Sequence, residues 1–140
     1  MYDQYFGESH ELLRASVRKF VEREIKPHID HWEEEGTFPL DLYKKAGDAG
    51  FIGLGYPEEY GGTPGDIFHQ VAYTEEIMRC GSVGLPSSLG SSAIAVPPIL
   101  ALGTEEQKRK YVPPVLAGDR IAVLGVTEPS GGSDVANLLT

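Results

Sequence analysis

The residues best suited to chemistry lie near the end of the sequence, in the segment VTEPSGGSD at positions 126–134. Gly131 and Gly132 permit positive φ, which lets successive backbone N–H groups converge on a phosphate oxygen. The Ser133 hydroxyl adds a donor beside them. This bend therefore predicts a phosphate-binding site. The alternative interpretation is an ordinary glycine-rich turn that Asp134 caps.

The apolar residues before the bend are expected to form a strand that leads into it. The run IAVLGVT at positions 121–127 is rich in β-branched residues and predicts a strand. Pro129 cannot donate to a β-ladder, so the strand has to end before it. Thr127, at the strand's end, offers a backbone N–H and a hydroxyl to a flat heterocycle. No second strand is visible upstream, although a strand needs a partner for its backbone groups.

The other titratable residues show no pattern typical of a catalytic or metal site. Carboxylate runs are usually solvated faces or helix-start charges, and this interpretation applies to Glu33–Glu35, Glu58–Glu59, Glu75–Glu76 and Glu105–Glu106. Four histidines are present, His10, His28, His31 and His69. Only His28 and His31 have a metal-like spacing, and they lack a third ligand. Cys80 is the single cysteine and is expected in the core.

Helical periodicity predicts the elements that must position the bend. Apolar residues recur at three- and four-residue steps from Ser9 to Glu35, with Ser9 as the N-cap and a kink or break at Pro27. A second helix is predicted over positions 40–49 and a loop over the glycine- and proline-rich positions 56–66.

Two further helices have clear start signals. Asp66 can cap a helix that ends at Cys80 and carries Ile67, Val71 and Met78 on one side. Thr104 and Gln107 form a T-x-x-Q capping box. Between them, positions 85–101 contain no charge, so we expect this stretch to be buried on most sides, with core packing as its first interpretation.

Composition limits the classes of function. The chain of 140 residues fits one domain, and its net charge of −9 opposes broad binding to nucleic acid or to anionic membrane surfaces. The polar, acidic start does not have the pattern of a secretory signal, and no apolar run of 18 residues is expected to cross a membrane. The cytoplasm is the expected compartment.

Three sequence blocks, taken together, carry a resemblance to a known family. PEEYGG at 57–62, GTEEQKRKYVPPVLAGD at 103–119 and VTEPSGGSD at 126–134 resemble, in order and spacing, the N-terminal part of the flavin-dependent acyl-CoA dehydrogenases. The resemblance implies a mainly α fold: an N-terminal helical domain over residues 1–120, followed over 121–140 by the first strand of a middle β-barrel domain that is otherwise absent. A C-terminal helical bundle would follow in the family.

The resemblance also implies roles for individual residues. Leu124, Val126 and Thr127 would lie along the flavin ring of FAD, and Gly132 and Ser133 would meet its pyrophosphate. Ser133 would also lie near the thioester of an acyl-CoA substrate. In the charge-free stretch, Gly90 and Ile94 would line the acyl channel.

The implied activity is the α,β-dehydrogenation of acyl-CoA thioesters, with electrons passing to an electron-transferring flavoprotein. The catalytic base is expected beyond Thr140, and a homotetramer is expected for the intact protein. The 140 residues alone are therefore expected to be inactive and to hold FAD weakly or not at all. Two alternatives remain open: a standalone helical interaction module without flavin, and part of a related flavin oxidase or monooxygenase.

Overall fold

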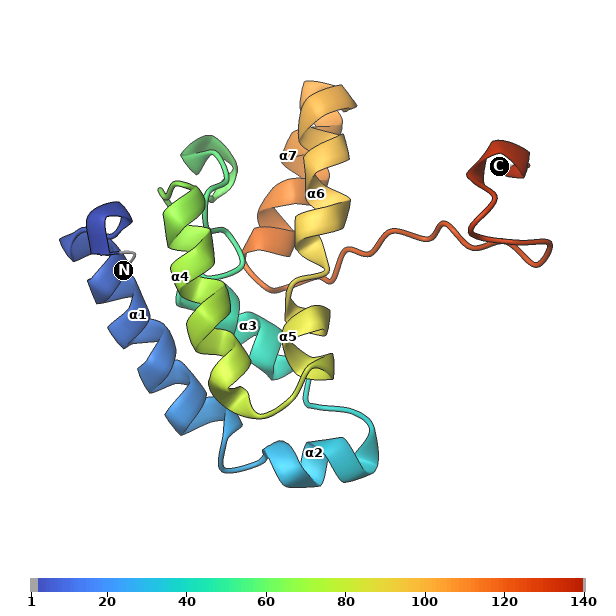
Figure 1. Cartoon of the computed structure of the whole chain (residues 1–140). Coiled ribbons are helices and arrows are strands. Elements are labelled where there is room, and N and C mark those ends of the chain that lie inside the picture. Colours follow the sequence, from blue (N-terminus) through green and yellow to red (C-terminus); the bar gives the residue numbers. More distant parts are fainter. Residues whose placement is uncertain (1–2, 140) are drawn as a thin grey trace.

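The computed structural model describes residues 3–139 and consists of helices joined by loops, followed by an extended C-terminal segment (Figure 1). The α-helices are α1 (Glu8–Phe20), α2 (Ile29–Glu35), α3 (Asp41–Asp48), α4 (Ile67–Ile77), α5 (Gly84–Leu89), α6 (Ser92–Leu102) and α7 (Glu105–Leu116). Short 3-10 helices are η1 (Asp3–Tyr5), η3 (Glu58–Tyr60), η4 (Met78–Cys80) and η5 (Val135–Asn137). A π-helical segment, η2 (Val21–Ile25), continues α1. The predicted mainly α fold is confirmed.

The N-terminal apolar stripe forms α1 and η2 and then, after a break, α2. Val17, Val21 and Ile25 are buried in the core, as their spacing predicts. The helix breaks at residues 26–28, since Pro27 has no N–H for the helical ladder. The start differs from the prediction: Gly7, not Ser9, is the N-cap residue, because the His10 side chain accepts the Gly7 backbone N–H at 2.8 Å.

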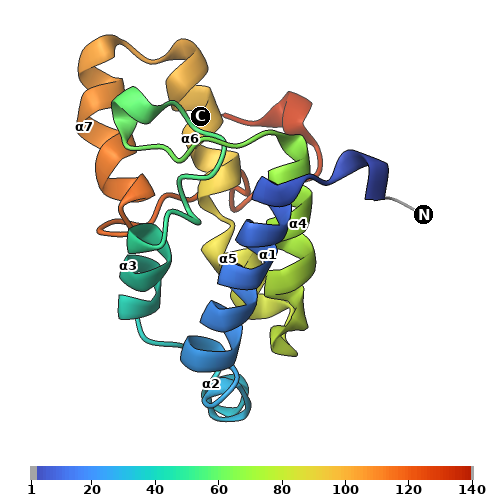
Figure 2. The same ribbon diagram turned by 90° about the vertical axis from the view of Figure 1, so that its left-hand side faces the viewer.

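Helix α4 packs along α1, and the two helices begin at the same end of the molecule (Figures 1 and 2). Asp66 caps α4 as predicted, accepting the backbone N–H of His69 at 2.9 Å. The side of α4 that carries the predicted apolar residues is exposed, however; these residues are Ile67, Val71 and Met78. Burial falls instead on the side that holds Glu76, whose charge is neutralised by arginines.

Glu76 is a buried carboxylate rather than part of a solvated charge run. Its side chain is 1% exposed, and Arg18 of α1 donates to its two oxygens at 2.8 and 3.0 Å. Arg79 and Arg14 approach it at 3.3 and 3.7 Å. The sequence interpretation holds for Glu75, which is 53% exposed, but is wrong for Glu76. The pair with Arg18 joins α1 to α4 across their contact face.

The charge-free stretch is two helices, α5 and α6, separated at Gly90–Ser91. Leu85, Leu89 and Val96 reach the core. The expectation that this stretch is buried on most sides is wrong. Within residues 84–102, only 28% of the apolar 18-residue span is buried. By length and hydropathy that span could cross a membrane, contrary to the sequence expectation. Its interruption and its core contacts favour packing within the helical domain. Helix α7 then returns beside α6 (Figure 1).

The chain after α7 leaves the helices in an extended conformation (Figure 1). The predicted strand at 121–127 has no ladder partner, and the described part of the chain, residues 3–139, contains only isolated β-bridges. A β-ladder requires a second backbone for its hydrogen bonds. The segment therefore has the extended backbone of a strand without the pairing.

Candidate functional site

The predicted phosphate-binding bend is a tight turn over residues 128–131. The Glu128 N–H donates to the Gly131 carbonyl at 2.9 Å, and the Gly131 N–H donates to the Glu128 carbonyl at 3.1 Å. Pro129 follows Glu128, at a turn position that suits its fixed φ. Gly131 and Gly132 permit positive φ but do not adopt it, since neither is among the described residues with positive φ. The Gly131 N–H is used inside the turn, so it does not belong to a phosphate nest.

Gly132 is required by a close approach rather than by its backbone angles. A Cβ at Gly132 would lie 2.8 Å from Thr127 Oγ1, which is closer than side-chain atoms tolerate. The structure therefore brings Thr127 and Gly132 together, with Ser133 next in the chain and exposed. Within residues 3–139, the N–H groups of Gly132 and Ser133 make no hydrogen bond. This side of the turn offers two N–H groups and two hydroxyls to a ligand.

Leu124 and Val126 lie on the extended segment that leads into the turn. Leu124 is 56% exposed and Val126 is 38% exposed. Neither belongs to the hydrophobic core or to the partly buried shell around it. They are available as an apolar surface beside Thr127, as the resemblance implies, but the described residues provide no second wall opposite them.

A separate apolar groove of about 510 Å³ lies between α4 and the α5–α6 pair. Gly90 lines this groove, and a Cβ there would lie 3.1 Å from the Pro86 carbonyl oxygen. Ile94 does not line it and is exposed, so the two predicted channel residues are not brought together. The residues that line it are Phe51, Ile52, Leu54, Tyr56, Gln70, Tyr73, Thr74, Ile77, Met78, Pro86, Ser87, Leu89, Gly90, Ser92, Ala93 and Pro97.

The groove has few polar groups and its lining contains no carboxylate or imidazole. Burial raises the pKa of the Tyr73 phenol and of the Tyr56 phenol above their ordinary value, so both stay neutral at pH 7. The Tyr56 hydroxyl donates to the Ser92 carbonyl at 3.4 Å. The groove suits an apolar chain. It lacks a group that could remove a proton.

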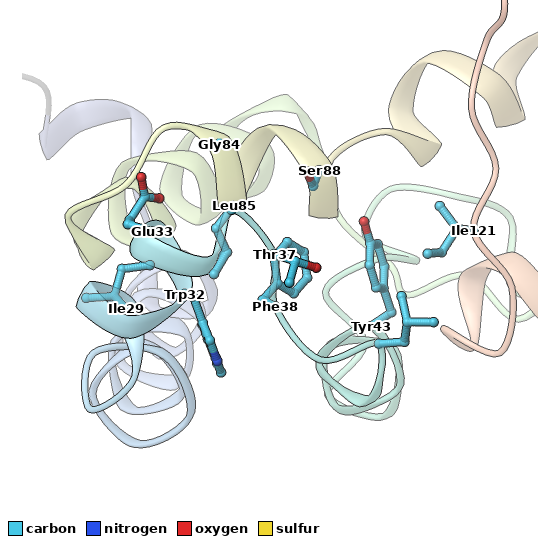
Figure 3. A pocket seen from close by; sticks show the side chains of 12 residues that line it. Ile29, Trp32, Glu33, Thr37, Phe38, Tyr43, Gly84, Leu85, Ser88 and Ile121 are labelled. Atoms are coloured by element: carbon cyan, nitrogen blue, oxygen red, sulfur yellow. The ribbon is translucent and has the colours of Figure 1, made fainter.

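A second hollow, of about 370 Å³, was not expected from the sequence. Figure 3 shows its labelled residues on α2, on the loop between α2 and α3, on α3 and on α5, with Ile121 at one edge. Trp32, Phe38 and Tyr43 form an aromatic row, with ring centroids 6.2 and 5.6 Å apart along it. Trp32 lies on α2, Tyr43 on α3, and Phe38 on the loop between these helices.

Two of the sequence blocks meet in space through Tyr60 and Glu105. The Tyr60 hydroxyl donates to the two Glu105 carboxylate oxygens, at 3.2 and 3.0 Å. Lys108, and then Tyr60, lower the pKa of the Glu105 carboxyl by hydrogen bonding. The contact fixes the loop at 57–62 against the start of α7. Neither residue lines the groove.

Comparisons with known proteins agree with this architecture. The family model "Acyl-CoA dehydrogenase, N-terminal domain" matches residues 7–119. The Bacillus subtilis protein named "Probable acyl-CoA dehydrogenase YngJ" is 37% identical over 93% of this chain and 34% of its own length. This chain therefore spans about a third of that curated relative.

Solved structures give the same result. A probable acyl-CoA dehydrogenase from Mycobacterium abscessus is 43% identical, with a TM-score of 0.89 over 96% of this chain and 36% of that one. An acyl-CoA dehydrogenase from Bacillus anthracis, solved in complex with FAD, is 31% identical, with a TM-score of 0.85 over 96% of this chain and 23% of that one. Sequence and fold together show that the chain belongs to the acyl-CoA dehydrogenase family, whose N-terminal helical domain it contains.

Proposed function

We propose that this chain supplies part of the acyl- and flavin-binding surface of an FAD-dependent acyl-CoA dehydrogenase, which carries out the α,β-dehydrogenation of acyl-CoA thioesters. The observation that carries the proposal is the apolar groove beside α4, within the volume range of small-molecule sites. The N–H groups of Gly132 and Ser133 and the hydroxyls of Thr127 and Ser133, which flank the turn at 128–131, support it independently.

The residues of the turn fit a flavin dinucleotide. Leu124 and Val126 would supply apolar contact to the ring, and Thr127 a hydroxyl and an N–H to its polar edge. Gly132 and Ser133 would hold the pyrophosphate through N–H and hydroxyl donors. These donors lie on the two sides of the turn over 128–131, whose backbone hydrogen bonds bring its two ends together. When bound, FAD would supply the acceptor for the hydride that leaves the β-carbon.

The groove would hold the acyl chain. Gly90 and Ala93 are among the small residues of its lining and leave room for methylene groups. An apolar wall excludes water and so strengthens each hydrogen bond to the substrate. The Ser133 hydroxyl is assigned to the thioester end, where a donor stabilises the charge that develops on the carbonyl oxygen.

The base that removes the α-proton is assigned to residues beyond Thr140. This assignment is supported by the groove lining, which has neither carboxylate nor imidazole. The 140 residues alone are therefore proposed to bind an acyl chain without turnover and to retain FAD weakly or not at all. We also propose that an electron-transferring flavoprotein accepts the electrons and that the intact protein is a homotetramer. Both of these proposals rest on the family alone.

The test fills the groove and measures the binding of a fluorescent acyl-CoA to the purified chain. Ala93→Leu adds three carbons inside the groove, whereas Ala101→Leu makes the same change on the same helix at an exposed position outside it. We expect Ala93→Leu to weaken binding at least about tenfold, equivalent to about 1.4 kcal/mol, and Ala101→Leu to leave it unchanged. Equal binding by all three proteins would remove the groove from the proposal. Acyl-CoA oxidation by the isolated chain would refute the assignment of the base.

A further inference from the structure

A cluster of two imidazoles and one carboxylate lies where the N-terminal ends of α1 and α4 meet, outside both the groove and the turn. His10, Asp66 and His69 each offer one ligand atom, and these atoms lie within 4.8 Å of one another. His10 Nε2 is 3.1 Å from Asp66 Oδ1, and His69 Nδ1 is 2.8 Å from the same oxygen. The two histidine side chains are largely buried, at 11% and 16% exposure, whereas that of Asp66 is 56% exposed.

Both histidines occupy the same position of their helices, and this fixes their rings. Each is the third residue after the N-cap, and each side chain receives the N-cap N–H: Gly7 to His10 Nδ1 at 2.8 Å and Asp66 to His69 Nδ1 at 3.2 Å. The two rings are in contact, with centroids 3.9 Å apart and planes tilted by 38°. Two imidazoles from separate helices are thus held against one carboxylate oxygen before any ligand arrives.

We propose that His10, Asp66 and His69 form a binding site for a divalent transition-metal ion of the Zn²⁺ class. Imidazole nitrogen and carboxylate oxygen are ligands that Zn²⁺ accepts, and three protein ligands leave one position for water. His10 binds through Nε2 and His69 through Nδ1. The Nε2–H of His69 then donates to Ser9 Oγ, which lies 3.2 Å away and fixes the tautomer as an outer-shell partner.

Metal binding would break the hydrogen bonds from two backbone N–H groups to the imidazoles, and water can replace the lost acceptors. Ligation through His10 Nε2 moves the ring proton to Nδ1, so the Gly7 N–H loses its acceptor. Ligation through His69 Nδ1 removes the acceptor of the Asp66 N–H. Gly7 and Asp66 are both exposed, and water can take these N–H groups.

The charges around the cluster are mixed. The positive ends of two helix dipoles oppose a cation, whereas Asp66 and the first-turn residues Glu8 and Glu11 of α1 favour one. The Asp66 carboxylate places its negative charge at the point where the two imidazoles converge.

The test titrates the complete untagged 140-residue chain with Zn²⁺ by calorimetry and with Co²⁺ by visible absorption. His10→Gln and His69→Gln remove the imidazole but keep an acceptor for the N-cap N–H, since glutamine at this position completes a capping box. The control, His28→Gln with His31→Gln, removes the two exposed histidines of the other pair. We expect one equivalent of metal to bind the wild type and the control, and at least about tenfold weaker binding by either single variant.

A measurement on the wild type alone keeps the proposal testable if a variant fails to fold. In imidazole ¹⁵N–¹H spectra, Zn²⁺ should shift the ring nitrogens of His10 and His69 and leave those of His28 and His31 in place. No binding to the wild type would overturn the site. Undiminished binding to both folded single variants, or shifts of His28 and His31 instead, would show adventitious surface binding only.

Discussion

The pair between Glu76 and Arg18 should contribute a large share of the stability of the α1–α4 contact. Glu76→Gln keeps the shape of the side chain but leaves one carbonyl acceptor in place of the two oxygens that Arg18 contacts at 2.8 and 3.0 Å. One charge-assisted hydrogen bond, of about 1.5–3 kcal/mol, is lost, and the other becomes a weaker bond to a neutral acceptor.

Partial compensation limits the loss. The amide is easier to bury than the carboxylate, and Arg18 is 56% exposed and can be hydrated once it is released. We therefore expect Glu76→Gln to lower the free energy of unfolding by about 2 kcal/mol. For a chain of this size the loss corresponds to a fall in Tm of roughly 6–8 °C. Urea unfolding followed by circular dichroism measures it directly.

The same pair predicts a pH dependence with a definite sign. Arg18, by hydrogen bonding, lowers the pKa of the Glu76 carboxyl in the folded state. A carboxyl with a lowered folded pKa stabilises the fold above its unfolded pKa, about 4.3, and the stabilisation is lost as the pH falls through the folded pKa. The difference between wild type and Glu76→Gln should be constant from pH 7 to about 5 and shrink below about pH 4.

Glu75 provides the matched control, since it is the adjacent residue, of the same type, and 53% exposed. Although it pairs with Arg14, Glu75→Gln should change the free energy of unfolding by less than about 1 kcal/mol, as exposed ion pairs do. Equal losses for Glu75→Gln and Glu76→Gln, or a Glu76→Gln loss that persists unchanged at pH 3, would refute this account.

Two further stability changes can be measured in the same unfolding assay. Thr104→Ala removes the hydroxyl that accepts the Gln107 N–H at 3.2 Å and should lower the free energy of unfolding by about 1 kcal/mol. Thr104→Ser keeps a hydroxyl and should lower it less. Equal losses for the two variants would exclude the cap as the cause. Leu116→Ala leaves a cavity in the core and should cost about 2–5 kcal/mol, whereas Leu102→Ala, at an exposed position of α6, should be nearly neutral. A large loss from Leu102→Ala would show that this helix end is covered in solution.

Local signals predicted most of the helical framework. The break at Pro27, the Asp66 cap and the Thr104–Gln107 capping box were all predicted, because each depends on residues within one turn of the chain. The family resemblance was visible for a similar reason, since its three blocks are short and contiguous. The same local reasoning failed at Gly7, where the cap uses a histidine side chain instead of the more usual serine.

Burial could not be predicted from such signals. The sequence placed the charge-free residues of α5 and α6 inside and the Glu75–Glu76 run outside, yet only 28% of the apolar span at 84–102 is buried and Glu76 is fully enclosed. Whether a carboxylate can be buried depends on a cation far away in the sequence, here Arg18 of α1.

For the candidate site, too, some features were predicted from the sequence and others were set only by the tertiary structure. The donors of the bend at 131–133 were predicted from their residue types, whereas the roles of Leu124, Val126 and Gly90 came from the family resemblance and stay predictions. The tertiary structure alone decided that Thr127 and Gly132 touch, that Ile94 lies outside the groove, and that His10 and His69 face one aspartate. Such contacts join residues from different helices or from the two sides of a turn, and only the packing of those elements sets the distance between them.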